Sequence, residues 1–163
     1  MQRRTLLGLG GAGAALLAMA GGGVAMLHER AWHDGKLLPA GRKVFASVAR
    51  AVLDGSLPSD AVAQAIAIES HLARVEATVN AMPPQTQAEL ADLLALLAMP
   101  PLRATFAGLS TAWEHASVTD VQEALQSMRQ STLLLRRQAY SALRDLTHAA
   151  YRSEEHTSEL QSR

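Results

Sequence analysis

Histidines and carboxylates are the residues of this sequence best suited to acid–base or metal chemistry, and they are scattered along the chain. Before the last twelve residues, the histidines are His28, His33, His71, His115 and His148. No two of them stand four residues apart with a third ligand nearby, although a helical zinc site needs ligands on one face. The carboxylates are also isolated, at Asp54, Glu69, Glu76, Asp92 and Glu114. We therefore predict no metal site and no catalytic residue.

A glycine-rich string near the start partly matches a nucleotide-binding loop. The string is Gly8-Leu-Gly-Gly-Ala-Gly13, but no strand precedes it, and a dinucleotide fingerprint requires one. No serine or threonine stands beside a recognisable base. The chain has no cysteine, which excludes thiolate metal sites and attached c-type haem. We expect this chain to bind no cofactor and not to be an enzyme on its own.

Paired arginines open the chain, directly before an uncharged stretch. Arg3 and Arg4 precede 23 uncharged residues, 5–27, which hold seven of the 11 glycines. A basic start, an apolar stretch and small residues are typical of a bacterial secretory signal. The arginine pair and the modest hydrophobicity favour the twin-arginine route, with Arg3, Arg4, Leu6 and Leu7 carrying the signal.

The export prediction leaves some alternatives open. An ordinary secretory signal or an uncleaved anchor would have the same general pattern, and cleavage could follow Ala20 or Ala25. In each case we expect a periplasmic protein, exported or associated with the membrane through residues 1–27.

The last twelve residues differ from the chain before them. Residues 152–162 resemble the conceptual translation of a common sequencing adapter, and their polar composition has no helical repeat. We therefore expect 152–163 to be a non-native tail and the native chain to continue beyond Tyr151.

The remaining body, residues 28–151, has the size of one domain with its own core. The whole chain has 15 basic and 15 acidic residues, and setting aside four arginines and three glutamates at the ends leaves 11 and 12. A nucleic-acid-binding face would need a basic excess, so we expect no nucleic-acid partner.

Hydrophobic periodicity predicts an all-α fold, a compact bundle of about five to six helices. Residues 28–41, broken by Gly35, Pro39 and Gly41, are expected to form a linker. Residues 42–53 repeat apolar positions at three and four residues, and a second helix should run from an N-cap at Ser59 to about Met82. The expected core stripe of that second helix is Val62, Ile66, Leu72, Val75 and Val79.

Capping and breaker residues place the remaining helices. Thr86 with Glu89 forms a capping box for a third helix, which Pro100-Pro101 should end. A short segment, 102–113, is interrupted by Gly108. Ser117 or Thr119 should cap a fifth helix, and a sixth runs through Leu134 and Leu146. No stretch alternates with the period of a strand.

Some residues of the second half are candidates for partner contact. An exposed Trp113 indole could anchor another protein, and arginines cluster just before Gln138. Three consecutive leucines, 133–135, cannot all face one core from a single helix. The candidate contact residues are Trp113, Arg129, Leu134, Arg137 and Tyr140. The alternative is that Trp113 fills the core and that the arginines are solvated.

Several segments together resemble one known family. They are Ala51-Val-Leu-Asp-Gly-Ser-Leu-Pro58, the leucine-rich 89–97 running into Pro100-Pro-Leu-Arg103, Gly108-Leu109 with Trp113, and 120–131. With the arginine pair, their order and spacing resemble the small third subunit of bacterial flavin-dependent gluconate 2-dehydrogenase and related sugar or alcohol dehydrogenases.

The resemblance implies a function in a complex. Such subunits accompany a large flavoprotein of the glucose–methanol–choline type, often with a cytochrome c subunit, and supply the signal for export through the twin-arginine translocase. FAD would then lie in the partner. A non-catalytic accessory subunit should expose a large apolar patch. The alternative, a stand-alone periplasmic helical protein that binds a small ligand, should have a closed surface and an internal cavity.

Overall fold

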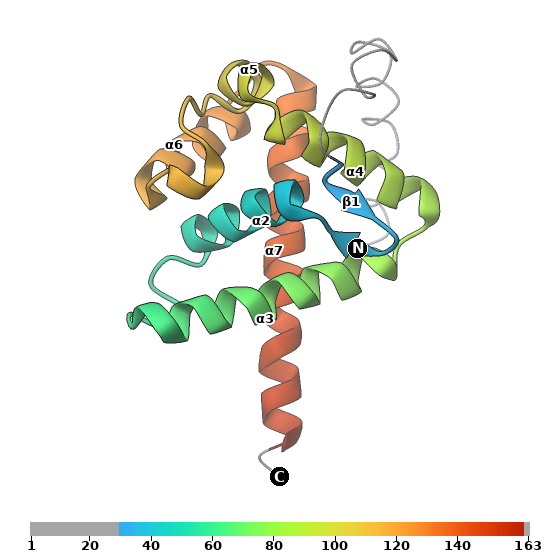
Figure 1. Cartoon of the computed structure of the whole chain (residues 1–163), viewed down its shortest axis with the longest axis vertical. Helices are drawn as coiled ribbons and strands as arrows, with labels where there is room; N and C mark the ends of the chain where they lie inside the picture. Colours follow the sequence, from blue (N-terminus) through green and yellow to red (C-terminus); the bar gives the residue numbers. More distant parts are fainter. Residues whose placement is uncertain (1–29, 162–163) are drawn as a thin grey trace.

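The computed structural model describes residues 30–161, with side chains up to Ser153. This part of the chain contains six helices and almost no strand, so the predicted all-α bundle is confirmed (Figure 1). The termini of the described chain lie apart, because the last helix projects beyond the others (Figure 1).

A small hairpin precedes the first described helix. Its strands are β1 (Trp32–His33) and β2 (Lys36–Leu37), paired antiparallel. The two turn residues between them, Asp34 and Gly35, have φ values of 46° and 74°. Positive φ at both positions defines the type I′ turn that suits a two-residue hairpin. The segment predicted as a linker is therefore ordered, and this part of the prediction is wrong.

Helix α2 (Pro39–Val52) lies at the centre of the bundle and packs against α3, α4, α6 and α7. Pro39 occupies its first turn, where a missing N–H costs nothing. Val44, Phe45 and Val48 are completely buried. At Gly41, a Cβ atom would come within 2.3 Å of the Ala31 carbonyl oxygen, so only glycine lets the hairpin approach this closely.

Helix α3 (Ala61–Asn80) begins one residue later than predicted, because Asp60 and not Ser59 is the N-cap. The Asp60 carboxylate accepts the backbone N–H of Ala63 at 2.8 Å. Leu72, Val75 and Val79 are buried as expected, but Val62 and Ile66 are 69% and 65% exposed. The predicted core stripe is therefore wrong in its first two turns.

Two prolines shape the next segment. Helix α4 (Pro84–Ala98) follows an N-cap at Pro83, so it begins before the predicted capping box at Thr86. Pro100 then starts α5 (Pro100–Leu102), which continues into a π-helical stretch, η1 (Arg103–Ala107). Gly108, with φ of 80°, ends this stretch in the left-handed conformation.

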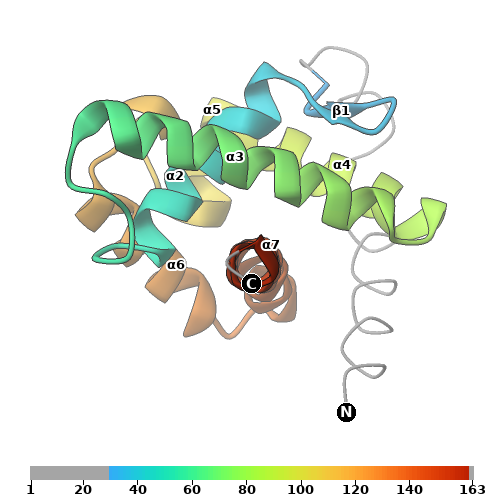
Figure 2. The same cartoon turned by 90° about the horizontal axis from the view of Figure 1, so that it is seen from below.

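The C-terminal half closes the bundle. After the 3₁₀ turn η2 (Trp113–His115), Ser117 caps α6 (Val118–Arg129) in a reciprocal capping box with Asp120. Of the two predicted caps, Ser117 is thus the correct one. Helix α7 (Leu134–Gln161) packs against α2, α3 and α6, and its backbone stays helical through residues 152–161. Figure 2 views α7 end-on, beside α3 and α6.

Candidate functional site

An exposed leucine pair marks the corner between α6 and α7. Leu133 and Leu134 are 62% and 59% exposed, whereas Leu135 packs against the core. Leu133 precedes the first residue of α7, and Leu134 and Leu135 point about 100° apart on the helix, so only Leu135 turns toward the core. Two of the three leucines therefore do not pack on the core, and their contact with another surface stays a prediction.

Hydrogen bonds from Arg136 connect this corner to the rest of the fold. Its Nε donates to the carbonyl of Phe106 at 2.7 Å, and its Nη2 donates to Ser127 Oγ at 2.9 Å. One guanidinium therefore joins the start of α7 to the π-helical segment and to α6. Its planar set of donors suits such a three-way contact.

Arg137 braces the loop that leads into α7. Its Nη1 donates to the carbonyls of Ser131 and Thr132 at 2.7 and 3.1 Å. The Ser131 hydroxyl in turn accepts the backbone N–H of Leu133 at 3.2 Å. The two exposed leucines are thus presented from a corner with its own hydrogen bonds, which lowers the entropy lost on binding a partner.

The other predicted contact residues lie near this corner or along α7. Arg129 is exposed, and its Nε donates to Gln126 Oε1 at 3.0 Å. Tyr140 is half-buried, with the guanidinium carbon of Arg144 at 5.5 Å from its ring centroid. Arg129, Leu134 and Arg137 therefore share the corner, and Tyr140 lies six residues, or about 9 Å, further along α7.

Trp113 is not part of this surface. Only 2% of the residue is exposed, and the indole Nε1 donates to the Leu97 carbonyl at 2.8 Å. Its own carbonyl accepts the Ser47 hydroxyl at 2.5 Å. The prediction of an exposed, partner-anchoring indole is wrong, because Trp113 fills the core between α2 and α4.

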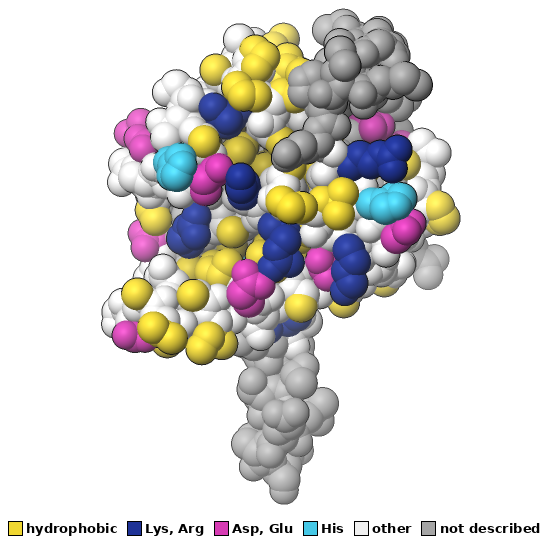
Figure 3. Space-filling model, in the orientation of Figure 1, with side chains coloured by type: hydrophobic (Ala, Val, Ile, Leu, Met, Phe, Trp, Pro, Cys, Tyr) yellow, Lys and Arg dark blue, Asp and Glu magenta, His cyan; other side chains and the backbone are white. Residues whose placement is uncertain are grey.

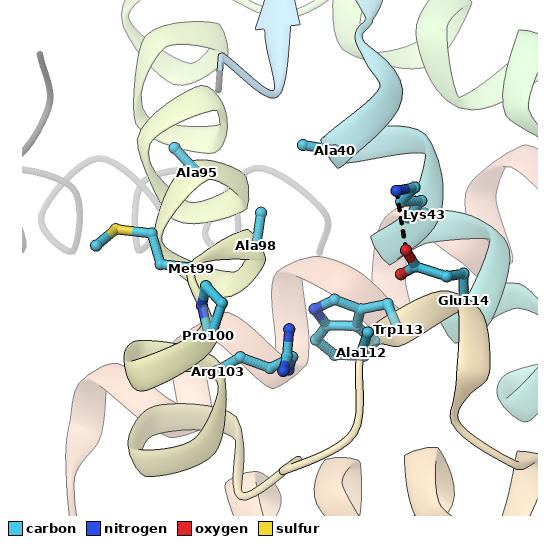
Figure 4. A pocket seen from close by; sticks show the side chains of 10 residues that line it. All are labelled: Ala40, Lys43, Ala95, Ala98, Met99, Pro100, Arg103, Ala112, Trp113 and Glu114. Atoms are coloured by element: carbon cyan, nitrogen blue, oxygen red, sulfur yellow. Dashed lines mark ion pairs between the residues drawn. The ribbon is translucent and has the colours of Figure 1, made fainter. Parts of the chain in front are cut away.

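A pocket of about 240 Å³ opens beside Trp113 (Figure 4). Small side chains from α2 and α4, including Ala40, Ala95 and Ala98, line it. Lys43 and Glu114 form an ion pair across its rim at 2.9 Å. The guanidinium of Arg103 donates to the carbonyls of Leu109 and Ser110, at 3.2 and 3.0 Å.

The chemistry of this pocket does not favour a small ligand. Drug-sized ligands occupy pockets of about 300–1,000 Å³ with polar groups that converge on the ligand. In this pocket, Lys43 and Glu114 are paired with each other, and Arg103 donates to backbone carbonyls of the chain. A hydrogen bond from Lys43, together with the positive charge of its ammonium group, lowers the pKa of Glu114. The Glu114 carboxylate therefore stays charged and paired with Lys43.

Most candidate carboxylates serve as structural partners. Glu69 pairs with Arg42, and Glu76 accepts Lys36 Nζ and the backbone N–H of Leu37, both at 3.0 Å. Asp92 differs, because burial and the neighbouring charge of Glu89 raise its pKa. Within the described residues, no three histidine, aspartate or glutamate side chains come together as a metal site.

His71 is the most perturbed titratable group of the described chain. It is 1% exposed on α3, and neither ring nitrogen has a hydrogen-bond partner. Burial, together with the nearby charge of Arg74, lowers the pKa of His71 from 6.5 to about 4. The imidazole is therefore neutral at physiological pH and acts as a core residue.

The predicted signal residues Arg3, Arg4, Leu6 and Leu7 lie outside the described residues. Within residues 30–161 no one helix is long and apolar enough to cross a membrane. Helix α4 and the stretch Pro100–Ala107 meet the length and composition only together, across an 87° bend.

Comparison with known proteins adds no family to this description. No protein-family model, no curated protein and no solved structure matches the chain. The fold defines the chain as an all-α bundle with one braced, leucine-bearing corner.

Proposed function

We propose that this protein is a non-catalytic accessory subunit. It binds a flavin-dependent sugar or alcohol dehydrogenase of the glucose–methanol–choline type and carries it through the twin-arginine route as a folded complex. The resemblance of residues 51–58, 89–103 and 120–131 to small dehydrogenase subunits supports this proposal, as does the arginine pair at Arg3 and Arg4. FAD would be held by the partner, which can also associate with a cytochrome c subunit.

The observation that carries the proposal is the exposed pair Leu133–Leu134. The two leucines are adjacent and both are over half exposed, and contiguous apolar patches with a polar rim are usual at sites of protein–protein contact. Arg129 and Arg137 stand beside this pair and can form a polar rim. The pocket beside Trp113, in contrast, offers a small ligand no unpaired charged group, so the stand-alone binding protein has less support.

In the proposed complex, Arg3 and Arg4 supply the export signal for the flavoprotein as well as for this chain. A signal for a route that moves folded proteins is useful to a chain whose partner folds around its cofactor before export. We expect that replacing Arg3 and Arg4 together by lysine leaves the flavoprotein's activity in the cytoplasm. Lysine keeps both positive charges, so the change tests recognition of the arginines and not general charge.

The experiment is co-expression of the full chain with the flavoprotein dehydrogenase proposed as its partner, followed by cell fractionation and an activity assay with an artificial electron acceptor. Wild-type chain should place the activity in the periplasm, and the double lysine variant should retain it inside. Co-purification of the two chains from the cytoplasm of the variant separates a failure of export from a failure of binding. Periplasmic activity at the wild-type level in the variant, or in cells without this chain, would refute the proposal.

A further inference from the structure

The outer face of α3 carries a row of exposed residues that no other described residue covers. Five positions, which we call the α3 seam, follow one another at spacings of four, three, four and four residues, so they share one side of the helix. They are Val62, Ile66, Glu69, Ala73 and Ala77, and each is exposed. Figure 3 shows hydrophobic side chains gathered at the lower left, where the first half of α3 lies.

Residue size changes along the seam in one direction. Its N-terminal half has the two large side chains, Val62 and Ile66, at 69% and 65% exposure. Its C-terminal half has only Ala73 and Ala77. A second copy of the seam that runs in the opposite direction would therefore place its small side chains against the large ones of the first copy.

We propose that the α3 seam binds a second copy of this chain, with the two α3 helices antiparallel. In that arrangement Val62 faces Ala77 of the second copy and Ile66 faces its Ala73. Both pairs have the same midpoint, between Glu69 and Ser70, so one two-fold axis satisfies both contacts twice. Such an isologous interface is the commonest way in which identical chains associate.

Two further features fit this partner. Alanines let helix axes approach to about 8 Å, close enough for the opposed valine and isoleucine to fill the space. Near the two-fold axis the Glu69 carboxylates of both copies would meet, which costs free energy. Each is already paired with Arg42 of its own chain, and this ion pair offsets the repulsion.

The size of the seam indicates a weak dimer. A helix of 20 residues is about 30 Å long, and contact through one helix from each copy is at the small end of specific interfaces. We therefore expect reversible association in the micromolar range, independent of the leucine corner and of any flavoprotein.

Single cysteines can test the geometry directly, because none of the 163 residues of the sequence is a cysteine. Val62→Cys and Ala77→Cys are prepared as separate full-length chains, mixed, and treated with a short bismaleimide. The mixture should give a cross-linked dimer, and each variant alone should not. Cross-linking of Val62→Cys with itself would indicate parallel helices and overturn the proposal, as would the absence of any cross-link in the mixture.

Sedimentation of the full chain measures the strength of the contact. Ile66→Glu should raise the dimer dissociation constant by about tenfold or more, because it places charge in the seam. Thr119→Glu adds the same charge to an exposed position of α6 and should leave the constant unchanged. A wild-type chain that stays monomeric at several hundred micromolar, or that forms a complex only with the flavoprotein, would overturn the proposal.

Discussion

His71 shows how one buried side chain makes the stability of this fold depend on pH. Its ring is 1% exposed on the inner side of α3, and its pKa is lowered from 6.5 to about 4. The folded state therefore binds the proton more weakly than the unfolded chain does. The contribution is fully present above pH 6.5, and it is lost as the pH falls from 6.5 through 4.

We expect the free energy of unfolding to decrease by up to about 3 kcal/mol between pH 7 and pH 4 through His71 alone. Urea unfolding followed by tryptophan fluorescence at several pH values measures this decrease. His71→Leu should remove most of the pH dependence in that window. His148→Leu, at an exposed position of α7, is the control and should keep it. An unchanged pH profile in His71→Leu would contradict the assignment.

At the scale of elements, Glu76 is the residue that joins the hairpin to the helices. Its carboxylate accepts the backbone N–H of Leu37 from β2, and it lies 3.8 Å from Arg42 Nη1 on α2. The carboxylate is nearly buried, and Lys36 covers its open side. The Glu76 carboxylate therefore links β2, α2 and its own helix, α3.

Replacing Glu76 should separate its role as an acceptor from its role as a charge. Glu76→Leu leaves the Leu37 N–H without a partner and should cost about 3 kcal/mol of unfolding free energy. Glu76→Gln keeps an acceptor oxygen and should cost about 1 kcal/mol, since the lost partner Lys36 is largely exposed. Chemical denaturation measures both values, and hydrogen exchange at Leu37 should quicken in Glu76→Leu. Equal costs for the two variants would contradict this role.

At the scale of the whole molecule, the leucine corner and the α3 seam are separate surfaces. Helix α3 meets α7 near Ala150, whose carbonyl accepts Arg74 Nε at 3.0 Å. Leu134 lies 16 residues before that point, about 24 Å along the helix axis. Changes so far apart, with no shared contacts, should act independently.

This separation predicts that each interaction can be abolished without affecting the other. Leu134→Glu should abolish co-purification with the flavoprotein and keep the chain dimeric, and Ile66→Glu should do the reverse. Their combination should show both defects with no additional loss of thermal stability, because both side chains are exposed. Pull-down and sedimentation on the same preparations check this. Loss of both interactions in either single variant would mean that the two surfaces are one.

The helices of this fold are predictable from the sequence where local rules apply. The breakers Pro100 and Gly108 mark the end of α4 and of the segment after it, and Ser117 caps α6 as one of two predicted residues, whereas the capping box expected at Thr86 placed the start of α4 too late. The turn of the hairpin is also predictable, since Asp34-Gly35 is a strong signal for a type I′ turn. It was missed because its strands are only two residues long.

Long-range contacts explain what the sequence could not show. Val62 and Ile66 lie on another side of α3 from Leu72, because Ile66 and Leu72 are six residues, or about 240°, apart on the helix, and Ile68 is buried in their place. Trp113 looked exposed in a short, polar context, and only the distant Leu97 carbonyl explains its burial. The brace of Arg136 across Phe106 and Ser127 likewise joins residues 30 and nine positions apart.

The position of α7 also determines when this protein can fold. Residues 139–150, from α7, provide much of the inner surface against which α2, α3 and α6 pack, and they follow all three helices in the chain. At about 5–20 residues per second, synthesis of the segment from α2 to residue 150 takes on the order of ten seconds. Through most of that time the apolar faces of the earlier helices have no cover. The start of the chain is thus accessible to cellular factors well before the body behind it can become compact.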